Sequence, residues 1–357
     1  CALPIFLNLS KNAKLEMLGC GNNQLTEINV SANPELWNFD CGMNQISAID
    51  ISGNPKLVYF YCGCNPITDI DVSNLEGLRS FGCDYTQIST IDVSHNPALE
   101  TLDCRGNRLT AIDVSHNPEL TLLQCNNNLL TALDISANPK LTELYFANFY
   151  DDDGGPDFRE REGNRIRTID LSNAPLLTGF NCSVNEMDTL DLSHNPLLEY
   201  IDCGGNNLTA LNVSHLSGLR ELYCWGNQFG TLDVTHNPAL ETLNCDDNGL
   251  STLDLSGNPN LASLSCSYNQ LVALDLSANA SLRDFWCGSN QLQTLDVSHC
   301  TGLEIFQCDH NLLNALDVSK NIDLRELRCE NNRLTALNIT ANTKLTELYF
   351  ANFYEDG

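Results

Sequence analysis

The apolar residues of this chain follow one short pattern that returns from end to end. Each copy has the block L-x-x-L-x-C-x-x-N-x-L, followed by a second block, L-D-V-S-x-N-P-x-L. Apolar and polar positions alternate within L-x-C and within L-D-V, which is typical of a half-buried strand. No segment has the apolar stripe of an amphipathic helix, and proline follows the second Asn position in nine copies. The pattern predicts two short extended segments per copy, each ended by an Asn-containing corner.

The copies are spaced at a fixed interval, and this interval determines the fold class. Fourteen of the 17 cysteines are 21 residues apart within two runs, from 20 to 125 and from 182 to 329, while Cys1, Cys64 and Cys300 lie outside them. With Cys as position 0, fifteen units run from residue 20 to residue 349. We therefore expect a β-rich solenoid of 21-residue turns with little or no helix. A parallel sheet on the Cys-bearing strand and a shorter second strand at L-D-V-S complete this prediction.

The L-x-x-L-x-C-x-x-N-x-L block resembles that of leucine-rich repeats. The nested 21-residue form with L-D-V-S resembles the bacterial class called IRREKO, and the column of Cys resembles the cysteine ladder of internalin J-like surface proteins. The resemblance covers nearly the whole chain, and it implies one right-handed leucine-rich repeat solenoid of about sixteen turns over residues 1–357. It also implies a bacterial recognition protein that is secreted or exposed at the cell surface.

Residues 21 apart stack on neighbouring turns at ~4.8 Å, so each position of the unit forms a column. We expect the Cys column to be buried reduced thiols, because Phe146 and Phe350 replace Cys and the C-x-x-C pairs of zinc sites are absent. The Asn columns at positions 3 and 13 are expected to bond corner backbone. Three turns, at Asn74, His215 and His299, lose the second Asn and gain Gly, which predicts another corner geometry.

Two further columns have reactive side chains. Position 9 is Asp in twelve turns, and repulsion between such carboxylates would raise some of their pKa values. We interpret these Asp as hydrogen-bond acceptors for a neighbouring turn; a stripe for divalent cations such as Ca²⁺ is the alternative. Six of the seven His share position 12, and His194, His215 and His236 are consecutive. A solvated corner is favoured over a transition-metal site because other turns have Ala, Gly, Lys or Asn there.

The stretch "IDVSHNPALETLDC" at 91–104 and its near-copy at 232–245 place Asp, Ser or Thr, and His together. These are the residues of a hydrolytic triad, which requires one pocket where Ser bonds His and His is oriented by Asp. Here the same residues recur along the solenoid with no single cleft. We therefore predict that the protein is not an enzyme.

Charge narrows the range of partners. The chain has 46 acidic and 18 basic residues, for a net charge of −28. Such a surface repels phosphate backbones and anionic membranes, so we expect neither nucleic acid binding nor membrane insertion. No apolar run reaches the ~20 residues of a membrane span.

Outward positions that vary between turns are the candidates for ligand binding. Those beside the Cys column include exposed aromatic rings, which suit stacking on sugars or anchoring a protein partner. The alternative is a scatter of surface aromatics that serve sheet propensity. The candidates fall into three groups: Trp37, Tyr59, Tyr61 and Tyr85; then Tyr200, Tyr223 and Trp225; then Tyr268 and Trp286 near Arg328.

One turn, at residues 146–181, is longer than the others by an insertion loop at 148–165. The loop clusters the carboxylates of Asp151, Asp152, Asp153 and Asp157. They are the candidate calcium ligands, and a solvated acidic loop is favoured over calcium because the spacing is not that of an EF-hand. No other cofactor is predicted.

The start of the insertion returns near the end of the chain. "KLTELYFANFYDDDG" begins at Lys140 and "KLTELYFANFYEDG" at Lys344, so a second-order repeat exists and we expect a window of a longer protein. The predicted function is non-catalytic adhesion to a protein or glycan through the Cys-strand face, outside or on the surface of a bacterium. A structural fibre or spacer formed by self-association is the first alternative, and a calcium-dependent surface module is the second.

Overall fold

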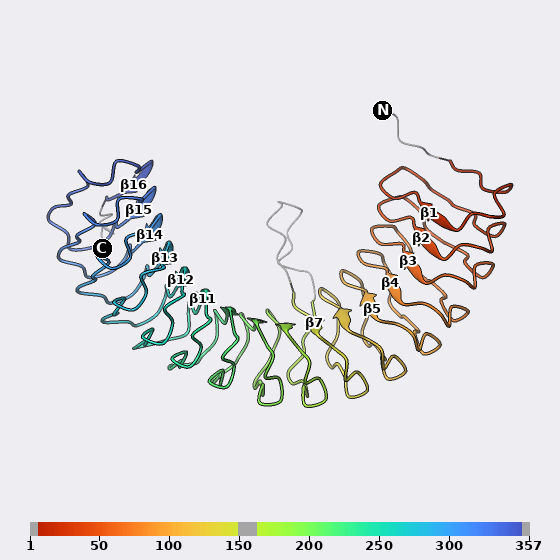
Figure 1. Cartoon of the computed structure of the whole chain (residues 1–357), viewed down its shortest axis with the longest axis horizontal. Helices are drawn as coiled ribbons and strands as arrows, with labels where there is room; N and C mark the ends of the chain where they lie inside the picture. The colour runs from red at the N-terminus through yellow and green to blue at the C-terminus, as the bar shows by residue number, and fades with distance from the viewer. Residues whose placement is uncertain (1–5, 149–162, 352–357) are drawn as a thin grey trace, which may run out of the picture. The chain divides into compact units, whose positions relative to one another are not determined.

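One three-residue strand per turn forms the regular secondary structure of the chain. The computed structural model describes residues 6–148 and 163–351. They divide into two compact units, Cys1–Met187 and Asp188–Gly357. Within each unit the strands stack in chain order, as Figure 1 shows for β1 to β5 and for β11 to β16. The described residues contain no helix, and so none that could cross a membrane.

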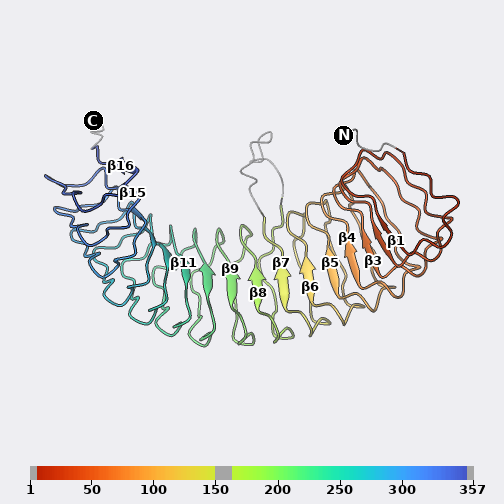
Figure 2. The ribbon, with the colours of Figure 1, turned by 45° about the horizontal axis from the view of Figure 1, so that its top comes forward.

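The first unit contains eight parallel strands in uniform register. They are β1 (Met17–Gly19), β2 (Asn38–Asp40), β3 (Tyr59–Tyr61), β4 (Ser80–Gly82), β5 (Thr101–Asp103), β6 (Leu122–Gln124), β7 (Glu143–Tyr145) and β8 (Gly179–Asn181). Figure 2 shows β3 to β7 side by side. Tyr59 lies opposite Asn38 on one side and Ser80 on the other. The long turn keeps this register, because Leu144 pairs with Phe180.

The second unit repeats this arrangement. Its strands are β9 (Tyr200–Asp202), β10 (Glu221–Tyr223), β11 (Thr242–Asn244), β12 (Ser263–Ser265), β13 (Asp284–Trp286), β14 (Ile305–Gln307), β15 (Glu326–Arg328) and β16 (Glu347–Tyr349). Each pairs in parallel with the next, and Tyr223 lies opposite Asp202 and Asn244. The predicted leucine-rich repeat fold with a parallel sheet on the Cys-bearing strand is confirmed.

The core consists of columns of identical or similar side chains. The middle residue of each strand points inward, and in the first unit Phe39, Phe60 and Phe81 are fully buried. Successive rings of this group stack at 5.6 Å between centroids. Phe285 and Phe306 repeat the contact at 5.4 Å in the second unit. Because every turn buries its apolar face only against neighbouring turns, stability depends on the repetition itself.

The first Asn column fixes the corner after each strand, as predicted. The Nδ2 of Asn44 donates to the carbonyl of Cys41 in its own turn and to that of Cys20 in the preceding turn, both at 3.0 Å. Its Oδ1 accepts the N–H of Leu25 at 2.9 Å. One buried amide thus satisfies backbone groups of two turns. One turn has Thr86 in place of this Asn, and its Oγ1 donates to the Cys83 carbonyl at 2.9 Å.

The three glycine-containing corners do not adopt another geometry, so this prediction was wrong. Leu75 replaces the second Asn, yet its N–H donates to the Val72 carbonyl at 3.0 Å, as Asn54 N–H donates to Ile51. What changes is the side-chain donor that reaches the preceding turn. Asn74 Nδ2 donates to the Ile51 carbonyl at 3.3 Å. His215 Nε2 lies 2.9 Å from the Leu192 carbonyl oxygen. In these two turns the preceding residue replaces the missing amide, and in the third the thiol of Cys300 contacts the Asn279 carbonyl at 3.5 Å, while the backbone turn is kept.

The shorter strand predicted at L-D-V-S is also absent from the described residues. The carbonyl of Val213, in one such segment, accepts the N–H of Leu216 in its own turn at 2.9 Å. It also accepts the Nδ2 of Asn237 from the next turn at 2.8 Å. Because corner groups already occupy this carbonyl, the segment cannot form a backbone ladder with its neighbour. The alternation of apolar residues correctly predicted that the Leu and Val side chains of this segment point inward. It did not predict which hydrogen bonds the backbone makes.

The second position after the Cys column has a left-handed backbone in turn after turn. Gly or Asn, which tolerate this region, occupy it in several turns, with φ of 61° at Gly205 and 55° at Asn22. Val184, Tyr85 and Tyr268 adopt it too, with φ of 55°, 48° and 55°. A β-branched residue such as Val184 is strained in this region. The pattern of side chains gave no sign of this column, because residues of every type occupy it.

Candidate binding surface on the strand face

The outward side chains of the sheet form a surface that we call the strand face. It consists of the first and third residue of each strand and the two residues after the Cys column. These side chains are half-buried or exposed in most strands, while the middle residue is buried. Uniform register places equivalent residues side by side at ~4.8 Å, so that neighbouring turns can build a patch.

Three of the first four candidate residues, Trp37, Tyr59 and Tyr61, lie close together. The rings of Trp37 and Tyr59 meet edge to face, with centroids 5.9 Å apart. Tyr61, on β3 with Tyr59, donates its hydroxyl to Ser80 Oγ on β4 at 2.9 Å. Tyr85 lies after β4 and is 42% exposed. The structure thus brings Trp37, Tyr59 and Tyr61 together over β2 to β4.

Glycines make room for several of these rings. A Cβ at Gly82 would lie 2.8 Å from the Tyr61 ring, and one at Gly106 would lie 2.5 Å from the Tyr85 ring. Each ring therefore covers the backbone of the following turn. The sequence analysis missed these glycines, although Gly one turn after an outward aromatic residue was the available signal.

The second candidate group occupies β9 and β10. The Tyr200 and Tyr223 rings lie 6.0 Å apart at an angle of 52°. Tyr223 donates its hydroxyl to Glu221 Oε2 at 3.2 Å. The indole of Trp225 covers Gly204, where a Cβ would lie 2.3 Å from Nε1. Tyr200, Asp202, Glu221, Tyr223 and Trp225 form what we call the β9–β10 patch.

The third group does not form one cluster. Trp286 on β13 and Arg328 on β15 are separated in the register by Gln307 of β14. The Arg328 guanidinium instead lies 4.5 Å from the centroid of the Tyr349 ring, and its Nε donates to Glu326 Oε1 at 2.7 Å. Tyr268 is 68% exposed. Sequence reasoning overlooked Tyr349, the next third-position residue along the sheet.

Half-buried carboxylates add charge to the strand face. Asp103 on β5 pairs with Arg105 at 3.0 Å. Burial and the nearby Asp84 raise the pKa of Asp103 to about 6, despite the opposing effect of Arg105. In the second unit, Asp246 accepts bonds from the Ser265 hydroxyl and the Ser267 N–H, while burial raises its pKa. These carboxylates already have ion-pair or hydrogen-bond partners within the protein.

The cysteine column consists of buried free thiols, as predicted, and its environment disfavours the reactive thiolate form. Every described lattice cysteine is a buried free thiol. Cys104 Sγ, for example, contacts the Gln124 carbonyl of the next turn at 3.5 Å. Burial raises the pKa of Cys20 to about 11 and that of Cys125 to about 12. A nucleophilic cysteine needs the opposite shift, toward the thiolate.

The Asp-Ser-His corners have hydrogen bonds in the wrong order for a triad. Asp233 Oδ1 accepts from the N–H of Thr235 at 2.9 Å and from its hydroxyl at 2.7 Å. The same hydroxyl lies 3.1 Å from His236 Nδ1, so the hydroxyl stands between carboxylate and imidazole. In a triad the imidazole stands in the middle. This corner therefore closes a local turn.

The same bonds correct two expectations about the Asp column. The acceptor serves its own turn and not a neighbouring one: Asp254 Oδ1 accepts the Ser256 N–H at 2.9 Å. Hydrogen bonds from Ser256 also lower the pKa of Asp254, where repulsion between turns predicted a rise. Local bonding outweighs repulsion because these side chains are exposed to water. Three or more His, Cys, Asp or Glu do not gather into a metal site anywhere among the described residues.

No family model matches the chain, and no curated protein matches it. Among solved structures, the functional domain of InlJ from Listeria monocytogenes, which includes a cysteine ladder, is 32% identical, with a TM-score of 0.76. The match covers 95% of this chain and 68% of that one. The chain belongs to the cysteine-ladder leucine-rich repeat proteins.

Other leucine-rich repeat proteins share the fold at lower identity. The protein LIC12759 of Leptospira interrogans is 17% identical, with a TM-score of 0.77, over 95% of this chain and 97% of that one. YopM of Yersinia enterocolitica is 22% identical, with a TM-score of 0.73, over 96% and 74%. At these identities the two structures show that they share the fold of this cysteine-ladder leucine-rich repeat protein.

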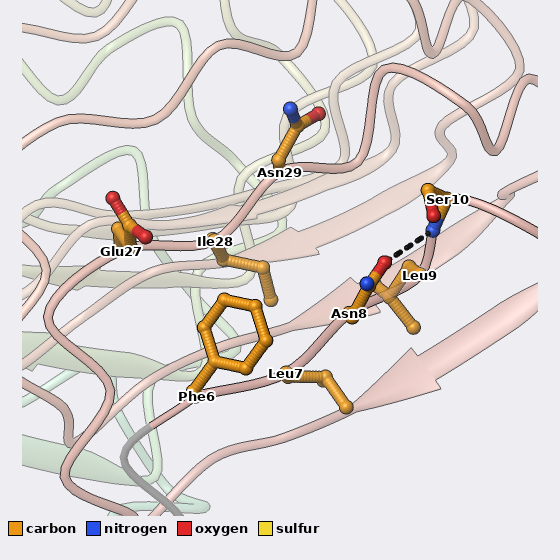
Figure 3. A pocket seen from close by; sticks show the side chains of 8 residues that line it. All are labelled: Phe6, Leu7, Asn8, Leu9, Ser10, Glu27, Ile28 and Asn29. Carbon is orange, nitrogen blue, oxygen red and sulfur yellow. Dashed lines mark hydrogen bonds between the residues drawn. The ribbon is translucent and has the colours of Figure 1, made fainter.

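Outside the strand face, the cysteine-ladder protein has a pocket in its first described turns and an insertion that contains the candidate calcium ligands. A pocket of about 300 Å³ lies at the first described turn, where Phe6 and Ile28 form part of the lining (Figure 3). Its one titratable side chain is Glu27, and Asn8 accepts the Ser10 N–H at 3.1 Å as other corners do. This lining has no nucleophile–base pair. The candidate calcium ligands Asp151, Asp152, Asp153 and Asp157 lie outside the described residues.

Proposed function

We propose that this chain is a non-catalytic recognition module that binds a protein ligand through its strand face, on the surface of a bacterium or after secretion. The observation that supports this most directly is the β9–β10 patch. Its rings take no part in the core, which the middle strand residues and the Cys and Leu columns already fill. Rigid aromatic side chains on an outward surface are the usual anchors of a protein interface.

The strand face suits a ligand because its scaffold is fixed on both sides. Core columns behind it and Asn-bonded corners beside it hold each outward residue in place, so binding need not order a loop. Glycan binding through the same rings is the closest alternative, since stacking on sugars also uses flat aromatic surfaces.

The test is a binding comparison on a protein array and a glycan array. We expect the wild-type chain to bind particular protein spots, and Tyr223→Ala/Trp225→Ala to lose at least about tenfold of that signal. Gly218→Ala is the matched control, because a Cβ there meets no atom within 4 Å. Equal signals from the double variant and the wild type would refute the proposal, and loss confined to glycan spots would favour the alternative.

A structural fibre or spacer is the second candidate function, supported by the second-order repeat that begins at Lys140 and again at Lys344. Sedimentation of the purified chain over a range of concentrations tests it: growth into long assemblies favours the fibre, and a constant monomer opposes it. For the calcium-dependent alternative, a fall in melting temperature on adding EDTA is the corresponding test.

A further inference from the structure

The tripeptide Glu-Leu-Tyr occurs on three strands in the same register. It forms β7 (143–145), β10 (221–223) and β16 (347–349). Leu144 and Leu222 are buried in the core, whereas Leu348, in the last described turn, is 41% exposed; Glu and Tyr are the first and third residues of each copy and lie on the strand face. What differs is the neighbouring strand, so the three copies show how one surface element responds to three environments.

On β16, the tyrosine has a guanidinium partner. Arg328 is the register neighbour of Tyr349, and its guanidinium carbon lies 4.5 Å from the ring centroid. The Arg328 Nε also donates to Glu326 Oε1 at 2.7 Å, and this bond to Glu326 raises the pKa of Arg328. A tyrosine ring and a carboxylate on adjacent strands of this sheet therefore have the spacing that holds an arginine side chain.

On β10, the residue at the position of Arg328 is an acid. The register neighbours of Tyr223 are Asp202 and Asn244, and neither is cationic. Glu221 accepts the Tyr223 hydroxyl at 3.2 Å. Burial, Glu221 and Asp202 all raise the pKa of Tyr223. The ring thus lies in a negative field, where its twin on β16 lies beside a positive charge.

A basic residue, Arg220, immediately precedes β10. It pairs with Glu241 at 2.6 Å and with Glu199 at 3.9 Å. Two more rings border the site. Tyr200 is 6.0 Å from Tyr223, and Trp225 lies against Gly204, whose N–H donates to Asp202 Oδ1 at 3.1 Å.

We propose that the β9–β10 patch binds an arginine side chain of the protein ligand, with the guanidinium stacked on the outward side of the Tyr223 ring, next to Tyr200 and beside the carboxylates of Asp202 and Glu221. This assignment rests on the proposed recognition function and adds the chemistry of the partner. The partner presents a basic segment, and the net charge of −28 speeds its approach. A planar guanidinium suits the site better than an ammonium because it stacks on rings and donates two parallel hydrogen bonds to a carboxylate.

The β7 copy of the tripeptide supplies a matched control. Tyr145 donates to its own Glu143 at 2.8 Å. The register neighbours of Glu143 are Leu122 and Gly179, so β7 has no second ring in the place of Tyr200. The strand therefore has the same sequence without the paired rings, and Tyr145→Leu should leave arginine binding at the β9–β10 patch unchanged.

The experiment uses Trp225 as a reporter in a full chain with Trp37→Phe and Trp286→Phe. Titration with an oligoarginine peptide should change its fluorescence to saturation, while oligoglutamine, oligoglutamate and chitooligosaccharide should not. Glu221→Gln and Asp202→Asn should each weaken oligoarginine binding about fivefold, and Tyr223→Leu by a similar factor. Melting curves identify any variant that unfolds, and Glu221→Gln removes charge without removing packing.

Each outcome decides a separate point. No saturable response to oligoarginine, or equal affinity in Glu221→Gln and the parent, overturns the arginine site. Binding of chitooligosaccharide in place of oligoarginine overturns it in favour of a glycan. The arginine site is also overturned if a protein on the array binds the wild type but not Tyr223→Ala/Trp225→Ala and has no basic segment. The proposed recognition function would stand in that case. If the wild-type chain itself gives no ligand-specific signal on the array, the recognition function is refuted.

Discussion

The corner side of each turn and the strand face use side chains in opposite ways. At the corners, Asn237 and Asn258 make the same two bonds to the preceding turn, at 2.8 to 3.0 Å. On the strand face, the equivalent residues of β9, β10 and β11 are Asp202, Tyr223 and Asn244. Repetition thus marks the residues that hold the solenoid together, and variation marks those available for recognition. If this division holds, a substitution at a buried corner should change the free energy of unfolding most, and one in the exposed Asp column least.

The largest effect is expected at a corner amide. Asn237→Ala removes the donor to the carbonyls of Val213 and Leu216, both at 2.8 Å in a buried site. We expect a loss of about 2 kcal/mol in the free energy of unfolding, measured by denaturant titration. Thr242→Ala on the strand face is the control and should cost much less. Similar losses for the two variants would contradict the division.

Restoring a missing amide should have the opposite sign. Cys300 occupies the second Asn position, and its thiol contacts the Asn279 carbonyl at 3.5 Å. Cys300→Asn offers two amide donors to the preceding turn, as in neighbouring turns, and should stabilise the chain by about 1 kcal/mol. Because the backbone turn is already the same there, the amide enters without rearrangement. A lower melting temperature in this variant would show that the turns with Gly differ more than their hydrogen bonds indicate.

A similar gain is expected from relieving strain after the strand. Val184 has φ of 55°, in a column where Asn is common. Val184→Asn should stabilise the chain by about 1 kcal/mol in thermal unfolding, because a β-branched side chain is disfavoured there. The reverse change, Asn22→Val, should destabilise it by a comparable amount. If the two changes do not have opposite signs, the left-handed column is not the source of strain.

The smallest effect concerns the Asp column. Asp254→Asn should leave the melting temperature at pH 7 within about 1 °C, because Asn29 accepts the Ser31 N–H at 3.0 Å just as Asp254 accepts that of Ser256. At low pH the stabilities of Asp254→Asn and the wild type should differ. Hydrogen bonds from Ser256 lower the folded-state pKa of Asp254, so its contribution exists above the unfolded pKa and is lost as pH falls through the folded one. The variant should therefore lose slightly less stability than the wild type below about pH 4.

The sequence predicted the parts of this structure that repeat. The interval of 21 placed Cys104 and Cys125 in the core and Asn44 at a corner, because each column has one environment throughout. It did not predict the absence of a second strand. Spacing reports the direction of a side chain, whereas the Asn237 amide determines whether the Val213 carbonyl can join a ladder.

The candidate surface was predictable only as a set of outward residues. The contact between Tyr200 and Tyr223 follows from the register, which the interval fixes. Contacts that depend on rotamers were not visible: Arg328 lies over Tyr349, two strands from Trp286. The glycines that seat the rings and the left-handed column belong to the backbone, and the hydrophobic pattern contains no information on either.

The most direct test of the division between corners and strand face is the array signal of Tyr223→Ala/Trp225→Ala relative to the wild type, taken at a temperature where both are folded. Our account predicts at least about a tenfold loss at the protein spots that the wild type binds, with no loss for Gly218→Ala. Undiminished binding by the double variant would contradict it, because the varied aromatic residues of β10 would then have no part in recognition.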